Sequence, residues 1–197
     1  MQLERLLKQM DFIKEIDKIK YIERRTKLFN SNRRENDAEH SWHLAMMAIV
    51  LAEHSNEPVD ILKVVKMVLI HDIVEIDSGD IFIYDTEMNH NNSEVERKAA
   101  QRIFGMLPRE QAEEFIALWE EFEANETAEA KFAKAVDRLE PLLQNSSNNG
   151  GTWQEYGVKH SQVIDKKIII NEGSETLWDY TTDLLDRCVE KGILSKD

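Results

Sequence analysis

An apolar run near the middle of the chain ends in side chains of the kind that bind metals. The run extends from Val64 to Ile70, the doublet His71-Asp72 follows at once, and Glu75 comes three residues later. A helix that is apolar for two turns belongs in a core, so these polar groups would lie at its edge. Desolvating them costs several kcal/mol unless something compensates, and a metal ion is the usual compensation. This stretch therefore predicts a helical core with a metal site at its edge.

The composition favours helices joined by short connections. Only 7 Gly and 3 Pro occur among 197 residues, so little of the chain is turn-forming, while 42% hydrophobic and 32% charged residues are typical of a globular protein. A chain of this length suits one domain with a substantial core. We expect an all-α domain over residues 1–197 with about seven or eight helices. Its core would span about 20–145, with C-terminal helices of about 152–190 packed on it.

Helical periodicity and capping residues give approximate bounds for these elements. Leu3, Leu6 and Met10 recur at helical spacing and predict a first helix over 2–21. A turn-like basic stretch should follow, with Asp37 as the N-cap of a second helix. The other predicted helices extend from about 60 through the doublet to 78, and over 93–104, 108–122, 127–144, 152–171 and 174–190. Residues 81–92 and 145–151 are expected to be loops.

Net charge and cysteine content restrict the partners and the compartment. The formal charge of -13 argues against nucleic acid, because phosphate-backbone binding needs a concentrated basic face, and against an anionic membrane surface. No apolar run reaches the roughly 18 residues of a membrane span. Cys188 is the only cysteine and fits a reducing compartment. We expect a cytoplasmic protein that acts on a small molecule.

Four candidate metal ligands lie on three predicted helices. They are His40, His71, Asp72 and Asp137, and facing helices can project such side chains toward one ion. Two imidazoles and two carboxylates suit Mn²⁺, Co²⁺, Fe²⁺ or Zn²⁺ rather than Ca²⁺. Four ligands leave positions for water and substrate, as catalysis requires. Each residue alone has an ordinary interpretation as a core, capping or solvated helical residue, so the prediction depends on the set.

The set resembles the HD-domain superfamily of metal-dependent phosphohydrolases. The segments that carry the resemblance are AEHSW at 38–42, HDIVEIDSGD at 71–80 and EAKFAKAVDRLE at 129–140. They are most similar to the 5′-deoxynucleotidase branch, which dephosphorylates deoxyribonucleoside monophosphates, and the similarity spans about 20–145. It implies a phosphomonoesterase that holds one divalent ion through His40, His71, Asp72 and Asp137.

The same resemblance implies roles for residues around the metal. Glu75 matches the catalytic glutamate of the branch, and a carboxylate beside a metal can exchange a proton with water or with the leaving oxygen. Asp80 matches an aspartate that contacts the sugar. Arg24 matches the arginine that contacts phosphate, for which a guanidinium fork is well suited. Arg33 is a further candidate for the phosphate.

Several alternatives remain open at this point. A nucleotide pyrophosphohydrolase of the alarmone type would use the same ligands, and a non-catalytic nucleotide-binding module could retain them. His43 is expected to support His40 rather than to bind metal, and His90 raises the question of a second ion, although one ion is favoured. Relatives are commonly homodimers. An apolar set on the last helix, which includes Leu177 and Leu185, could be an interface but is more readily core.

Overall fold

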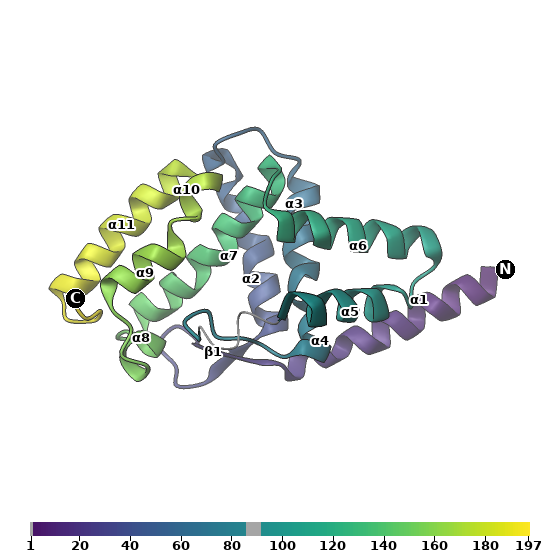
Figure 1. The fold of residues 1–197 in the computed structure, drawn as a ribbon, viewed down its shortest axis with the longest axis horizontal. Coiled ribbons are helices and arrows are strands. Elements are labelled where there is room, and N and C mark those ends of the chain that lie inside the picture. Colours follow the sequence, from purple (N-terminus) through teal and green to yellow (C-terminus); the bar gives the residue numbers. More distant parts are fainter. Residues whose placement is uncertain (1, 86–91) are drawn as a thin grey trace.

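The structure is a computed structural model in which residues 2–85 and 92–197 are described. Helices dominate it, as predicted, and the two ends of the chain lie at opposite ends of an elongated molecule (Figure 1). Eight of the described helices have eight residues or more. They are α1 (Gln2–Ile16), α2 (Asp37–Leu51), α3 (Ile61–Ile70), α5 (Asn92–Phe104), α6 (Arg109–Ala124), α7 (Ala128–Ser147), α9 (His160–Lys167) and α11 (Glu175–Glu190).

Helix α7 is the centre of the fold. It packs against α2, α3, α6 and α11 and against the short helix α10 (Ile170–Gly173), and Figure 1 shows it crossing the middle of the molecule. Phe132, Val136 and Leu139 are buried along it, which agrees with an apolar face at helical spacing. The central position places Asp137, on the same helix, inside the protein rather than in solvent.

A small sheet replaces the turn that was predicted after the first helix. Strand β1 (Glu23–Lys27) pairs antiparallel with β2 (Arg34–Asn36). The charged sequence hid this pairing, because only Thr26 in β1 and Glu35 in β2 are buried and no apolar alternation marks the strands. The predicted N-cap was also one residue late. Asn36 caps α2, and its side chain accepts a hydrogen bond from the Glu39 backbone N–H.

The predicted helix through the doublet changes its winding at the doublet itself. Helix α3 ends at Ile70, residues 71–74 form a 3-10 turn, η3 (His71–Val74), and the one-turn helix α4 (Glu75–Ser78) follows. Gly79 then ends the helix with a φ of 74°, a conformation that glycine adopts at no steric cost. The tightened turn holds all four of its residues in the buried part of the protein.

The C-terminal third differs from the sequence prediction in its details. Helix α7 extends to Ser147 and so includes Asn145, which was expected in a loop. The buried Asn145 side chain accepts hydrogen bonds from the Thr152 backbone N–H and hydroxyl, which satisfy its oxygen. The stretch expected as one helix over 152–171 is divided into α8 (Gly151–Glu155), α9 and α10. Leu177 and Leu185 of α11 are buried, as favoured from sequence.

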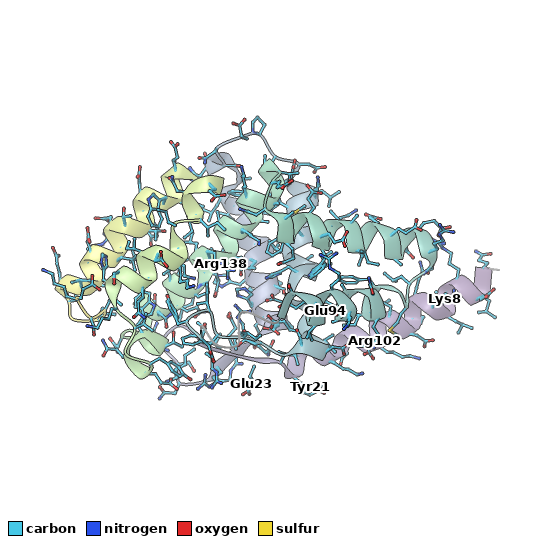
Figure 2. All side chains as sticks on the ribbon, viewed as in Figure 1. Lys8, Tyr21, Glu23, Glu94, Arg102 and Arg138 are labelled. Carbon is cyan, nitrogen blue, oxygen red and sulfur yellow. The ribbon has the colours of Figure 1, made fainter. Side chains whose placement is uncertain are left out.

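Ion pairs connect the N-terminal helix to the segment that carries the doublet. Arg102 of α5 lies 2.8 Å from Glu15 of α1 and 2.7 Å from Asp77 of α4 (Nη2 to Oε1 and to Oδ1). Figure 2 shows Arg102 where α5 runs beside α1. Among the described residues, no helix is long and apolar enough to cross a membrane.

Candidate metal centre

The four predicted ligands meet where three elements converge. His40 Nε2 of α2 lies 3.1 Å from Asp137 Oδ1 of α7, and His71 Nε2 of η3 lies 3.7 Å from the same oxygen. His71 Nε2 is also 3.0 Å from Asp72 Oδ1, while His40 Nε2 is 4.0 Å from Asp72 Oδ2. All four side chains are buried. His40, His71 and Asp72 offer ligand atoms that all lie within 4.8 Å of one another, and Asp137, 97 positions from His40 in the sequence, adds an oxygen beside the two histidines.

The backbone orients the imidazole of His71. Its Nδ1 is 3.0 Å from the carbonyl oxygen of Val68, and since a carbonyl only accepts, Nδ1 carries the proton and donates it. Nε2 is then the nitrogen that faces the carboxylates. It is a buried atom without a hydrogen-bond partner among the described residues. An unsatisfied buried nitrogen aimed at two carboxylates fits a bound cation.

Two glutamates that were not identified from the sequence lie beside the Nδ1 atom of His40. Its Nδ1 lies 3.3 Å from Glu140 Oε2 and 3.4 Å from Glu35 Oε2. Carboxylates in this position orient a ligand histidine and raise its basicity. Glu140 also lies 3.1 Å from His43 Nδ1, so His43 is attached to the support and not to the ligand cluster. The three-residue spacing from Asp137 to Glu140 was a signal for this role, because such residues share a helix face.

The charges of the cluster are strongly coupled. Burial alone would lower the pKa of His71, but the carboxylates of Asp72 and Asp137 raise it to about 9. Burial alone would raise the pKa of Asp72 and of Asp137, but neighbouring positive charges hold both below the ordinary value: His71 for Asp72, and Arg138 and the two histidines for Asp137. The carboxylates are therefore ionised, and a cation bound here would replace the proton that the raised pKa retains on His71.

A second group of carboxylates lies beside the ligand cluster. Asp37, Glu75 and Asp80 offer oxygens that are all within 4.8 Å of one another. Burial and the charge of Asp72 raise the pKa of Asp37 to about 7 and raise the pKa of Glu75 well above its usual range. Both the proposed proton carrier Glu75 and the proposed sugar contact Asp80 thus adjoin the metal ligands.

Arg24 of β1 is held among these carboxylates. Its Nη1 lies 2.9 Å from Asp72 Oδ2 and 3.2 Å from Asp37 Oδ1, and its Nε is 3.7 Å from Glu35 Oε2. The structure therefore brings this predicted phosphate contact to the site. It does not bring Arg33 there, since Arg33 forms a two-pronged ion pair with Glu39 on the surface, each N–O distance being 2.9 Å. His90 lies outside the described residues.

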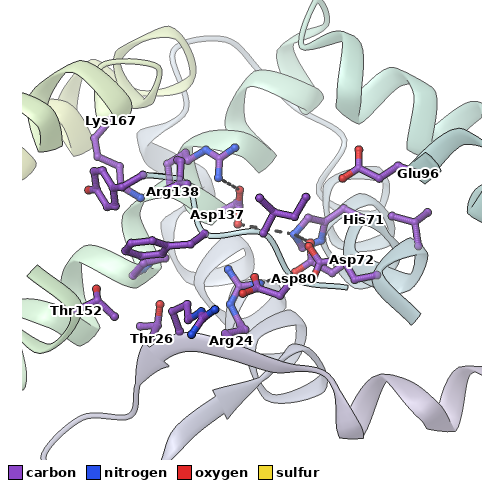
Figure 3. A pocket seen from close by; sticks show the side chains of 18 of the residues that line it. Arg24, Thr26, His71, Asp72, Asp80, Glu96, Asp137, Arg138, Thr152 and Lys167 are labelled. Atoms are coloured by element: carbon purple, nitrogen blue, oxygen red, sulfur yellow. Dashed lines mark hydrogen bonds and ion pairs between the residues drawn. The ribbon is translucent and has the colours of Figure 1, made fainter. Parts of the chain in front are cut away.

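The cluster opens into a cavity of about 360 Å³, within the range of pockets that bind small molecules. Figure 3 shows His71, Asp72 and Asp137 on its wall, with Arg24 and Asp80 below and Arg138 and Lys167 above and to one side. Further aromatic and aliphatic side chains complete the lining; among them are Phe82, Tyr84, Trp119, Phe122, Leu142 and Trp153. A buried cation site open to a cavity of this size suits catalysis on a small molecule.

Comparisons with known proteins agree with this geometry. A family model described as HD domain matches residues 16–178. The 5′-deoxynucleotidase HDDC2 of Bos taurus is 30% identical over 154 residues, 75% of this chain and 73% of that protein. A predicted metal-dependent phosphohydrolase from Magnetospirillum magnetotacticum MS-1, solved as a crystal structure, is 54% identical; the alignment has a TM-score of 0.92 and covers 96% of this chain and 95% of that one. An HD-domain phosphohydrolase from Listeria innocua shares the fold at 19% identity and a TM-score of 0.61, with 92% and 85% covered.

Proposed function

The chain belongs to the HD-domain family and is a metal-dependent phosphohydrolase, and from this premise we propose that it hydrolyses (deoxy)ribonucleoside 5′-monophosphates to nucleoside and inorganic phosphate. The observation that carries the proposal is one cavity that joins the ligand cluster to Arg24, Glu75 and Asp80. Relatives at about 30% identity are named 5′-deoxynucleotidase, which supports the same substrate class.

The residues His40, His71, Asp72 and Asp137 would hold one divalent ion, and we propose Mn²⁺, Co²⁺, Fe²⁺ or Zn²⁺ because the ligand set mixes nitrogen and oxygen. When bound, the ion supplies Lewis-acid chemistry and lowers the pKa of a nearby water. The histidines are oriented in advance by the Val68 carbonyl and Glu140.

Glu75 is the residue proposed to exchange the proton. Its carboxyl adjoins the ligand Asp72 through the 3-10 turn, and one of its oxygens is buried without a hydrogen-bond partner among the described residues. A group in this position can hold a proton and deliver it to the departing 5′-oxygen, or take one from the attacking water.

Arg24 and Asp80 are proposed to position the nucleotide. The guanidinium of Arg24 would neutralise charge that spreads over the phosphoryl oxygens in the transition state. Asp80 lines the same cavity, and as a hydrogen-bond acceptor it would receive the 3′-hydroxyl of the sugar.

A matrix of nucleoside 5′-monophosphates against divalent metals, scored for inorganic phosphate, tests the proposal. We expect His71→Ala to abolish release, while His54→Ala, a matched change in a histidine away from the cavity, retains it. Pyrophosphate as the product would favour a pyrophosphohydrolase instead. Nucleotide binding without turnover under every metal would favour a non-catalytic binding module.

We also propose a cytoplasmic homodimer. The α2 residues Trp42, Met46, Ile49 and Val50 form an apolar stripe at helical spacing, and each is at least 43% exposed among the described residues. Such a contiguous apolar stripe is unusual on a monomer's surface. Sedimentation of the wild type against Val50→Glu would test the dimer.

The cytoplasm is proposed as the compartment because Cys188, a free buried thiol, suits a reducing environment.

A further inference from the structure

A buried lysine on the cavity wall is not accounted for by the metal site. Lys167 is the last residue of α9 and is only 2% exposed, yet it lines the cavity. Among the described residues its ammonium group has no ion pair and no hydrogen bond. Burying a cation without a partner costs free energy that must be compensated elsewhere. Such groups are concentrated at functional sites.

Arg138 lies between Lys167 and the metal ligands (Figure 3). Its Nη1 is 3.4 Å from Asp137 Oδ2, whereas the other oxygen of Asp137 faces the two histidines. The positive charge of Arg138 is also the strongest charge acting on Lys167, whose pKa is lowered to about 7 by burial and then by this neighbour. The two cations thus lie on one part of the cavity wall, and Arg138 directly contacts Asp137, one of the proposed metal ligands.

The rest of the cavity is acidic and needs cations before it can take a phosphate. Its lining includes Asp72, Glu75, Asp80, Glu96, Glu123 and Asp137. Arg24 already contacts Asp37 and Asp72. Arg25, the remaining arginine of the lining, is exposed and donates to the Tyr156 hydroxyl at 3.3 Å. Lys167 and Arg138 are therefore the more enclosed cations that can take a new anion. The hydroxyl of Tyr84 lies beside the indole of Trp153 and within the field of Arg138. Because an indole N–H only donates, the Tyr84 O–H remains available as a donor.

We propose that Lys167 and Arg138 form a phosphate-binding subsite that holds the phosphoryl group of the nucleotide from the side opposite Arg24. The inference rests on the proposed function for its substrate. A lysine ammonium and an arginine fork are the side chains that bind phosphate most strongly. The phosphate would then be bound on one side by Arg24 of β1 and on the other side by Arg138 of α7 and Lys167 of α9.

Calorimetric binding of inorganic phosphate to protein loaded with Mn²⁺ tests the subsite without turnover. We expect Lys167→Met to weaken phosphate binding by roughly tenfold or more, and Lys167→Arg to restore most of it, because charge-assisted hydrogen bonds supply the affinity. Lys166→Met is the matched control, since it removes the same charge from the preceding position of the same helix. The variants are compared at equal metal content and at equal helical content, as measured by circular dichroism.

Equal phosphate affinity in Lys167→Met and the wild type would overturn the subsite, as would equal losses in Lys167→Met and Lys167→Arg. If the methionine variant loses helicity, Lys167→Gln takes its place. The nucleoside without phosphate should bind Lys167→Met and the wild type alike, and a loss there would also count against the subsite. Phosphate binding that depends on Lys167 without nucleotide turnover would retain the subsite and reject the proposed nucleotidase function.

Discussion

The two cationic walls of the cavity differ in how their charges are balanced. On the β1 wall, Arg24 is surrounded by carboxylates, with Asp72 at 2.9 Å and Asp37 at 3.2 Å. On the wall formed by α7 and α9, Arg138 contacts only Asp137, at 3.4 Å, and Lys167 contacts no carboxylate among the described residues. Equal charges in one cavity therefore differ in how much of their charge is already neutralised. Arg24 both holds buried carboxylates together and is proposed to contact the phosphate, whereas the proposed role of Arg138 and Lys167 is in ligand binding.

The largest expected effect comes from removing a residue that is proposed to bind the divalent ion. Asp72→Ala should lower metal-dependent phosphate release by at least about 10³-fold, because it removes both a ligand and the partner of Arg24. Colorimetric phosphate release is the measurement. Asp77→Ala is the matched control, since Asp77 is on the same segment but pairs with Arg102. Wild-type turnover by a metal-containing Asp72→Ala protein would remove Asp72 from the ligand set.

Because the two walls differ, removing one positive charge from each should change the free energy of unfolding by different amounts. Arg24→Met should lower the free energy of unfolding by about 3–5 kcal/mol, because it leaves buried carboxylates without their cation. Lys167→Met should not destabilise the protein near neutral pH, because folding must lower the pKa of the buried Lys167 amine to about 7 and methionine removes that cost. Urea unfolding of both variants in metal-free buffer measures the difference. Equal destabilisation would show that the walls do not differ in this way.

A smaller effect is expected from the support behind His40. Glu140→Gln keeps the size of the side chain and removes the charge that faces His40 Nδ1 at 3.3 Å. We expect metal affinity to fall by about 10–100-fold, as for other residues that support ligand histidines. Competition with a chromogenic chelator gives the affinity. Glu129→Gln, at the surface end of the same helix, should leave the affinity unchanged.

The smallest expected effect is a pH dependence of stability at Lys167. Burial lowers its pKa to about 7, with Arg138 and Arg24 acting in the same direction and Asp137 and Glu140 opposing them. As the pH falls from about 10.5 to about 7, the unfolded chain binds a proton at this residue and the folded chain does not, so stability is lost over this window.

Lys167→Met removes that loss. Its melting temperature relative to wild type should therefore rise continuously as the pH falls toward 7. Thermal unfolding in phosphate-free buffer from about pH 10 to pH 7 measures the shift. A difference between the two proteins that is constant with pH would show that Lys167 keeps its proton throughout.

The helical class was predicted from local periodicity, whereas the ligand cluster was predicted from the combination of four residues and its resemblance to a known family. The apolar run before His71 and the inward face around Asp137 are readable as helix patterns, and the structure brings these residues together with His40. The small sheet was missed because the stability of β1 depends on pairing with β2 and not on its own composition. The sequence could not show which of the two candidate arginines contacts the substrate. Arg24 and Arg33 have similar surroundings in the sequence, but of these two only Arg24 lines the cavity.

Lys167 could not have been identified from its sequence. Lys166 and Lys167 are adjacent and chemically identical, and only the packing of α9 decides that one of them enters the core. The spacing from Val163 to Lys167, one helical turn, suits a buried face, but a lysine on such a face ordinarily extends to solvent. Its enclosure is a tertiary property.

The 3-10 turn at the doublet has a consequence for the direction of two side chains. In an α-helix, residues three positions apart differ by about 60° around the axis, whereas three residues complete one turn of a 3-10 helix and are eclipsed. The Glu75 backbone N–H donates to the Asp72 carbonyl, so the two carboxylates project from the same side, one above the other. The direction of the Glu75 side chain relative to Asp72 is therefore set by the backbone N–H of Glu75, which donates to the Asp72 and Ile73 carbonyls. Rewinding this turn to α-helix would rotate Glu75 away from Asp72.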